Sequence, residues 1–400
     1  MKKGSKWDSD SEEEGTDGVT CKKARVEGAA GPASAALAAA QSGPLKLQPA
    51  SVQPLPAPPT VAPPRPRPPR HQPLFHGCRS IEEYERLNFI DQGTYGFVFK
   101  ARDKKTREVF AIKQVKLVSS DVGKVGFPIT ALRETNILLA LRHPNIVSVK
   151  EMVIGSSNDK VFMVMEYGDN DLKHCMSLAT QPFSTAEVKR LMLQLLSAME
   201  HMHNKWYIHR DLKTSNLLYS NAGKLCVCDF GLARTYGSPI APFTAEVVTL
   251  WYRCPELLLG SRLYSTPLDM WSVGCIFGEM LSGKPLLPGE GEADQLSRIF
   301  RLLGAPSEDR WPGVSLLPNF NRVTASRAPS RGKLRELFPS TSFSGGIFLG
   351  DQGFDLLSQL LELDPSRRIS ATAALQHPWF AEAPLACNMA LMPKFASKGD

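Results

Sequence analysis

Proline is crowded into the first part of this chain, and the crowding limits where a folded domain can begin. Of the 31 prolines, 13 fall before residue 74, most densely in Pro63-Pro64-Arg65-Pro66-Arg67-Pro68-Pro69. Proline fixes φ and lacks an N–H donor, so such a tract favours extended polyproline II segments. It follows a mixed-charge stretch (1–28) and an alanine-rich one (29–40), which bury too little apolar surface to offset the entropy of ordering. We therefore predict a disordered tail over residues 1–76.

Composition and charge restrict the class of the remaining chain. With 42% hydrophobic and 22% charged residues, it can bury a sizeable core. The net charge of +7 is spread out, because residues 1–70 hold 10 Lys/Arg against 7 Asp/Glu and the rest 37 against 33. We therefore expect no direct nucleic-acid partner. The eight cysteines show no zinc or disulfide spacing, and no apolar run suggests a signal peptide or membrane span. We expect a reduced, intracellular protein with no membrane partner.

Hydrophobic periodicity divides the rest of the chain into two parts. Short β-type runs occupy 87–90, 97–101, 109–113, 146–149 and 161–165, with one helical stretch at 131–140. Helical patterns then dominate, at 188–203, 265–281, 293–303, 353–363 and 371–380. The sequence therefore predicts an α+β protein in which a small β-rich lobe and a larger helical lobe form a cleft.

Three separated features of the β-rich part suggest a phosphate-binding site. Gly93-Thr94-Tyr95-Gly96 lies between two predicted strands, where glycine lets a hairpin close over phosphate groups. Lys113 ends a later strand, and Glu134 lies on the helix that follows. A lysine that holds phosphates must itself be oriented, and an ion pair with a glutamate does this.

The strongest motif lies further along the chain. His209-Arg210-Asp211-Leu212-Lys213-Thr214-Ser215-Asn216 is followed by Asp229-Phe230-Gly231 and then by Cys254-Pro255-Glu256. In phosphoryl transfer, Asp211 would accept or align the proton of the attacking hydroxyl, while Asn216 and Asp229 would hold Mg²⁺. With these motifs the sequence resembles the eukaryotic protein kinase superfamily over residues 84–380.

This resemblance implies the bilobal kinase fold with ATP and Mg²⁺ at the cleft. The N-lobe would span 84–168 and the C-lobe 169–380, followed by a C-terminal tail at 381–400. It also implies that Lys213 contacts the transferred phosphate, as in serine/threonine kinases, and that Glu256 pairs with Arg368 as a structural tie.

The helix and the activation segment are similar to those of the cyclin-dependent kinases. The helix reads Pro128-Ile129-Thr130-Ala131-Leu132-Arg133-Glu134, and no Thr-x-Tyr, which would mark a MAP kinase, occurs between Asp229 and Glu256. This resemblance implies that a cyclin pushes the helix inward to close the Lys113–Glu134 pair. It also implies that Thr244 is an activating phosphorylation site, held by Arg133, Arg210 and Arg234.

Within this family the sequence is most similar to the PITSLRE type, with the PISSLRE type close behind. The segment 77–84 is similar to both types, whereas Gly93-Thr94-Tyr95-Gly96, Lys104-Lys105-Thr106 and Leu212-Lys213-Thr214-Ser215-Asn216 favour the PITSLRE type. The helix motif itself has the sequence best known from the transcription-elongation kinase. This similarity implies an L-type cyclin and a nuclear enzyme of transcription, splicing or the cell cycle, with a cytoplasmic location left open.

The family resemblance also implies an ATP pocket, carried over residue by residue. Glycines 93 and 96 would border the phosphates, and charge at inhibitory sites Thr94 and Tyr95 would repel them. It also implies that Ile90, Val98 and Ala111 sandwich the adenine and that Met165 is the gatekeeper residue. Glu166 and Gly168 would offer the hinge backbone groups, and Asp171 would reach the ribose.

The resemblance finally implies a substrate preference. Val247, Val248 and Arg253 match the site that accepts the residue after the phosphorylated Ser or Thr. Proline has no N–H to leave unsatisfied there, so we predict Ser/Thr-Pro protein substrates. The alternative is a catalytically silent scaffold that keeps the fold to bind a cyclin.

Overall fold

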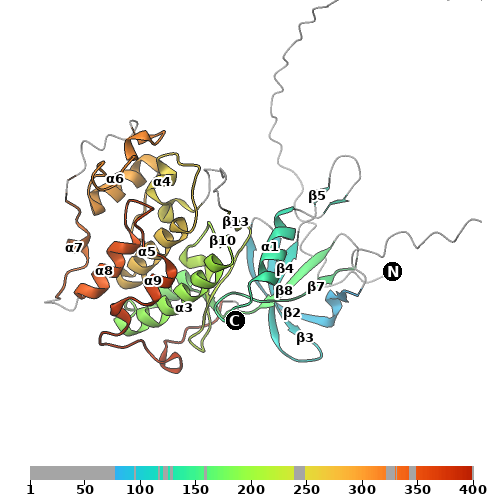
Figure 1. The fold of residues 1–400 in the computed structure, drawn as a ribbon. Helices are drawn as coiled ribbons and strands as arrows, with labels where there is room; N and C mark the ends of the chain where they lie inside the picture. Colours follow the sequence, from blue (N-terminus) through green and yellow to red (C-terminus); the bar gives the residue numbers. More distant parts are fainter. Residues whose placement is uncertain are drawn as a thin grey trace, which may run out of the picture. The chain divides into compact units, whose positions relative to one another are not determined.

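The computed structural model describes residues 77–93, 96–115, 118–119, 125–126, 129–156, 160–237, 248–320, 329, 331–341 and 348–398. The predicted tail of residues 1–76 lies outside these ranges. A β-rich lobe with one long helix is followed by a helical lobe, which confirms the predicted α+β class (Figure 1).

The N-lobe is built on one six-stranded sheet with the order β1-β7-β8-β4-β3-β2. Neighbouring strands are antiparallel except for the parallel pair β1 and β7. The strands of this sheet are β1 (Arg79–Ser80), β2 (Tyr84–Gly93), β3 (Gly96–Asp103), β4 (Val109–Val115), β7 (Val149–Ile154) and β8 (Val161–Glu166). Short paired strands elsewhere are β5 (Val118–Ser119), β6 (Val125–Gly126), β9 (Asn170–Asp171), β10 (Tyr207–Ile208), β11 (Leu217–Tyr219), β12 (Leu225–Val227) and β13 (Arg234–Thr235).

Most helices of the described residues lie in the C-lobe. Within the described residues, the N-lobe has the helix α1 (Ile129–Ala140), and the C-lobe has α2 (Leu172–Leu178), α3 (Thr185–Asn204), α4 (Pro255–Leu258), α5 (Pro267–Ser282), α6 (Glu292–Leu303), α7 (Leu334–Leu337), α8 (Asp351–Leu360) and α9 (Ala371–Leu375). Ser184 and Glu187 form a capping box at the start of α3, and Gly283 ends α5 with a φ of 70°. None of the helices in the described ranges is long and apolar enough to cross a membrane.

Side chains on the two faces of the sheet belong to different cores. Phe162 and Val164 pack with Ile81 and Tyr84 in a small outer cluster, whereas Met163 between them joins the large cluster that fills the C-lobe. This alternation follows the two-residue period of a strand. The large core is therefore continuous from the C-lobe to the inner face of the sheet, and it joins the two lobes where the predicted site lies.

Two predicted elements differ from the observed ones. The helix predicted over 371–380 ends at Leu375, and a separate 3-10 turn (Pro378–Phe380) follows, capped by the His377 side chain. Pro378 lacks an N–H donor and clashes with the preceding turn, so it cannot continue the helix. The strand predicted over 146–149 begins only at Val149, because Ile146 forms an isolated bridge to Val227 instead.

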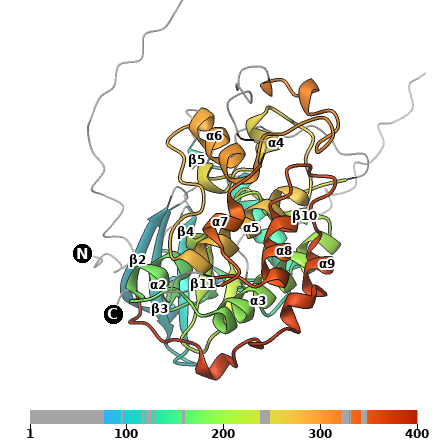
Figure 2. The ribbon, with the colours of Figure 1, turned by 90° about the vertical axis from the view of Figure 1, so that its left-hand side faces the viewer.

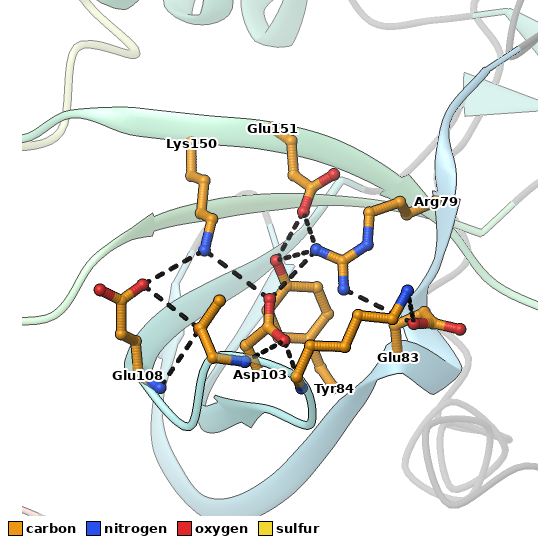
Figure 3. A network of polar contacts seen from close by, with 9 residues as sticks. Arg79, Glu83, Tyr84, Asp103, Glu108, Lys150 and Glu151 are labelled. Atoms are coloured by element: carbon orange, nitrogen blue, oxygen red, sulfur yellow. Dashed lines mark hydrogen bonds and ion pairs between the residues drawn. The ribbon is translucent and has the colours of Figure 1, made fainter.

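A polar network connects Arg79, near the start of the described residues, to the sheet (Figure 3). Arg79 Nη1 lies 3.1 Å from Asp103 Oδ2 and 2.9 Å from Glu151 Oε1, to which the Tyr84 hydroxyl also donates at 2.6 Å. Asp103 is buried and accepts two backbone N–H donors of its turn through Oδ1. Burial alone would raise the pKa of Asp103, but these hydrogen bonds and the Arg79 guanidinium lower it to about 2.

Replacing Asp103 with asparagine should destabilise the protein at neutral pH by about 1 kcal/mol, because the carboxylate is buried but its partner Arg79 is 29% exposed. Because the folded pKa lies below the usual 3.8, the stabilisation by the carboxylate is fully present above pH 4 and is lost as the pH falls toward 2. The difference in urea midpoint between wild type and Asp103→Asn should therefore be constant from pH 7 to pH 5 and shrink below pH 4. A difference that does not change with pH would contradict this assignment.

Candidate active site

A cavity of about 280 Å³ lies between the sheet and the C-lobe, and most of the predicted ATP-binding residues line it. Nine of the twelve do so: Ile90, Gly96, Val98, Ala111, Lys113, Met165, Glu166, Gly168 and Asp171. Gly93 pairs with Gly96 across the β2–β3 hairpin but is not among the lining residues. Thr94 and Tyr95 lie outside the described residues. The catalytic candidates Glu134, Asn216 and Asp229 line the same cavity.

Gly96 is the position of the hairpin where only glycine fits. Its φ is +139°, and a Cβ atom added there would lie 2.2 Å from the Gln114 carbonyl oxygen. A side chain would therefore clash with β4, and the backbone approaches the cavity closely at this point.

Lys113 and Glu134 form an ion pair between β4 and α1. Lys113 Nζ lies 2.8 Å from Oε1 and 3.1 Å from Oε2 of Glu134, whose side chain is 5% exposed. Burial alone would lower the pKa of Lys113, but the charges of Glu134 and Asp229 raise it above its usual value. The lysine is thus held as a cation at the cavity wall. The pair is closed in this structure.

Asp211 is the centre of a second polar cluster. Its Oδ2 accepts hydrogen bonds from Lys213 Nζ at 2.8 Å and from Asn216 Nδ2 at 3.1 Å. Its Oδ1 accepts from the Thr249 hydroxyl at 2.9 Å and the Thr249 amide at 3.2 Å. The carboxylate is therefore fixed in one orientation by donors from the motif itself and from the end of the activation segment.

The donors of Asn216 and Asp229 are suited to a hard cation. Asn216 also donates its Nδ2 to the Asp211 carbonyl at 2.8 Å, which leaves its side-chain oxygen available to a metal. Asp229 contributes a carboxylate, and its φ of 60° is a strained conformation often found at functional sites. Amide and carboxylate oxygens match the ligand preference of Mg²⁺. Both residues thus fit the predicted metal site.

The arginines predicted to hold a phosphothreonine lie on three different elements. Arg133 is half-buried on α1, and Arg234 lies on β13. Arg210 has a φ of 69° and donates to the Leu232 carbonyl at 2.8 Å and the Tyr264 hydroxyl at 2.9 Å. Thr244 lies outside the described residues, so its approach to the three arginines remains a prediction.

Val248 adopts an unusual backbone conformation beside Arg253. Its φ of 68° is rare for a β-branched residue, and its carbonyl accepts from Arg253 Nη2 at 2.9 Å and Nε at 3.2 Å. Arg253 is in turn paired with Glu292 at 2.6 Å. The Val248 carbonyl is therefore turned toward this arginine. Val247 lies outside the described residues.

The structure brings functional residues to the site that the sequence did not identify. Thr249 contacts Asp211 and, at 3.1 Å, Lys213 Nζ. Asp269, fully buried on α5, accepts from the backbone amides of His209 and Arg210 at 2.8 and 2.9 Å and so supports the strained loop. An acid within the run Leu268–Phe277, in which Ser272 is the only other polar side chain, could have indicated Asp269, because buried carboxylates need dedicated donors. No local signal indicated Thr249.

Comparisons with known proteins agree with this geometry. The protein kinase domain family model matches residues 84–380. The chain is 55% identical over 322 residues to "Cyclin-dependent kinase G-2" of Oryza sativa subsp. indica, covering 80% of this chain and 45% of the rice protein. It is 52% identical over 324 residues to "Cyclin-dependent kinase 11B" of Homo sapiens, covering 81% and 39%. The protein of that name from Rattus norvegicus is 51% identical over 324 residues, covering 81% and 72%. The chain thus spans less than half the length of the rice and human relatives.

Proposed function

Since this chain belongs to the protein kinase family, and within it to the cyclin-dependent kinases, we propose that it transfers the γ-phosphate of ATP to Ser or Thr of protein substrates. The observation that carries the proposal is the juxtaposition of the Lys113–Glu134 ion pair with Asn216 and Asp229 around one cavity. Asp211, which Asn216 contacts directly, adds a fixed carboxylate beside it.

Each polar group then has one task in the reaction. The Lys113 ammonium, kept charged by Glu134, holds nucleotide phosphates. Asp211 aligns the substrate hydroxyl and accepts its proton, and Lys213 offers positive charge to the transferred phosphate. Mg²⁺ held by Asn216 and Asp229 would neutralise charge on the phosphates. Thr249, which contacts both Asp211 and Lys213, holds these two side chains in place relative to each other.

The apolar cavity walls suit an adenine ring. Ile90 and Val98 come from β2 and β3, and Ala111 from β4. Met165 would act as gatekeeper, and the backbone of Glu166 and Gly168 would offer hydrogen bonds to the base.

The outer surface of α1 supports a cyclin partner. Ile129, Leu132 and Leu139 are 69%, 45% and 51% exposed, and their spacing places them on one face of the helix. An apolar helix face exposed in this way is typical of an interaction surface. We propose an L-type cyclin and a nuclear location, from the similarity to the PITSLRE-type kinases.

Phosphorylation of Thr244 would act as the second switch. A phosphate dianion would bind Arg133, Arg210 and Arg234, whose guanidinium groups would repel one another if they converged without it. The activation segment would then be ordered around the substrate site.

The conformation of Val248 supports a preference for proline after the phosphorylated residue. With its carbonyl held by Arg253, Val248 offers no acceptor to a substrate N–H at that position. An alanine there would leave its N–H unsatisfied, at a cost of about 1–3 kcal/mol.

The test is to purify the chain with its cyclin and compare Ser-Pro and Ser-Ala peptides of otherwise equal sequence. We expect kcat/KM to favour Ser-Pro by roughly 10- to 100-fold. Arg253→Met should release the Val248 carbonyl and reduce the ratio, mainly through faster turnover of Ser-Ala. Equal turnover of both peptides by the wild type would refute proline direction, and no phosphate transfer to either would refute the kinase activity.

A further inference from the structure

The C-terminal segment returns to the nucleotide cavity. Residues 387–398, here called the C-terminal strap, contact α3 at their beginning and end beside the start of α2 (Figure 2). Lys398, the last residue of the strap, lines the cavity together with Tyr167, Asp169 and Asp171. The sequence predicted only a tail beyond the kinase domain here.

The strap is fixed by contacts along its length. At its beginning, the Cys387 carbonyl accepts from Arg190 Nε at 2.5 Å and the Cys387 amide donates to the Ala186 carbonyl at 2.8 Å. In its middle, the Phe395 ring meets the rings of Phe183 and Tyr219 edge to face, with centroids 6.3 and 5.8 Å apart.

Its last residues pair with the segment that follows the hinge. The Lys398 amide donates to the Asp169 carbonyl at 3.0 Å and to Asn170 Oδ1 at 2.9 Å, and Asn170 Nδ2 donates to the Ala396 carbonyl at 2.9 Å. The Ser397 hydroxyl donates to Asp169 Oδ1 at 3.3 Å. These contacts fix the backbone of Lys398 at the edge of the cavity.

The Lys398 side chain reaches the predicted ribose acid. Its Nζ lies 3.2 Å from Asp171 Oδ2, while Asp171 Oδ1 accepts from the His174 amide at 2.8 Å and caps α2. The Asp171 side chain is 14% exposed and that of Lys398 is 38% exposed. A sugar hydroxyl entering here would meet one carboxylate oxygen that accepts and one ammonium that donates.

We propose that the C-terminal strap is part of the nucleotide site, in which Lys398 and Asp171 together bind the two ribose hydroxyls of ATP. One hydroxyl donates to Asp171 Oδ2, and its neighbour accepts from Lys398 Nζ. A vicinal diol presents both functions on adjacent carbons, so an ammonium–carboxylate pair complements it. This proposal rests on the proposed kinase function, since it adds Lys398, a residue outside the family motifs, to the ATP contacts that the resemblance implies.

The experiment compares Lys398→Met, which keeps the aliphatic stem, with Lys394→Met, which removes an exposed lysine of the same strap. Lys398→Met should raise KM for ATP roughly 5- to 10-fold with kcat nearly unchanged, because a ground-state contact is lost. It should also weaken discrimination between ATP and 2′-deoxy- or 3′-deoxy-ATP. Lys394→Met should behave as wild type. Phe395→Ala, which loosens the strap, should reproduce the rise in KM with Lys398 still present.

Calorimetric titration with ADP distinguishes a failure of the proposed Lys398 contact from a failure of the proposed kinase function. Equal ADP affinity in wild type and Lys398→Met would refute the role of Lys398 while leaving the kinase function intact. A lower KM in Lys398→Met would also overturn the proposal, because it would mean that Lys398 competes with the ribose for Asp171. A wild-type chain that does not bind ADP would refute the proposed function, and this inference with it.

Discussion

Replacing Glu256 with glutamine should lower the free energy of unfolding by about 3–5 kcal/mol, the usual cost of removing one partner from a buried ion pair. Arg368 donates to Glu256 through Nη1 at 2.7 Å and Nη2 at 3.0 Å, and the two side chains are 0% and 4% exposed. In the wild type the Glu256 charge raises the pKa of Arg368 although burial opposes it. In the variant the guanidinium still stays charged, because arginine is not deprotonated in proteins. A buried cation would then lack its compensating charge.

Thermal unfolding measures this effect, and a fall in Tm on the order of 10 °C is expected for a domain of this size. Glu362→Gln is the matched control, because Arg368 contacts only the backbone carbonyl of Glu362. The double variant Glu256→Leu, Arg368→Met should be more stable than Glu256→Gln, because it removes both charges at once. An unchanged Tm in Glu256→Gln would show that this pair does not stabilise the C-lobe.

The pair Glu256–Arg368 also illustrates what the sequence could predict. Glu256 belongs to the motif Cys254-Pro255-Glu256, and the resemblance alone was enough to pair it with Arg368, 112 residues later. The structure confirms the ion pair. The α+β class was predictable for the same reason. In addition, the hydrophobic period changes from strands to helices near residue 183.

The contacts that the sequence could not predict depend on tertiary proximity. Thr249 follows the predicted Val248, but its hydrogen bond to Asp211 exists only because the end of the activation segment returns to that loop. The strap has no periodic pattern. It is held by backbone and side-chain contacts to partners about 170 to 230 residues earlier in the chain, such as Asn221 for Phe395 and Asp171 for Lys398. Neither composition nor local spacing carries such information.

Replacing Asp211 with asparagine should abolish most phosphotransfer while leaving the fold and nucleotide binding intact. Asparagine can still accept from the Thr249 hydroxyl, but it cannot take a proton from the substrate, and its amide nitrogen opposes the Lys213 ammonium. We expect kcat to fall roughly 10²- to 10⁴-fold, the range for loss of a general base. Asp211 does not line the nucleotide cavity, so KM for ATP should change little.

This variant also separates an active kinase from a silent scaffold with the same fold. Steady-state assays with a Ser-Pro peptide give kcat, and co-purification gives cyclin binding, which Asp211→Asn should retain because α1 is unchanged. Asp309→Asn, at an exposed acid of the C-lobe, controls for the loss of one negative charge and should keep wild-type turnover. If Asp211→Asn turned over as fast as Asp309→Asn, any phosphate transfer would have to proceed without this carboxylate, and Asp211 would have no part in it.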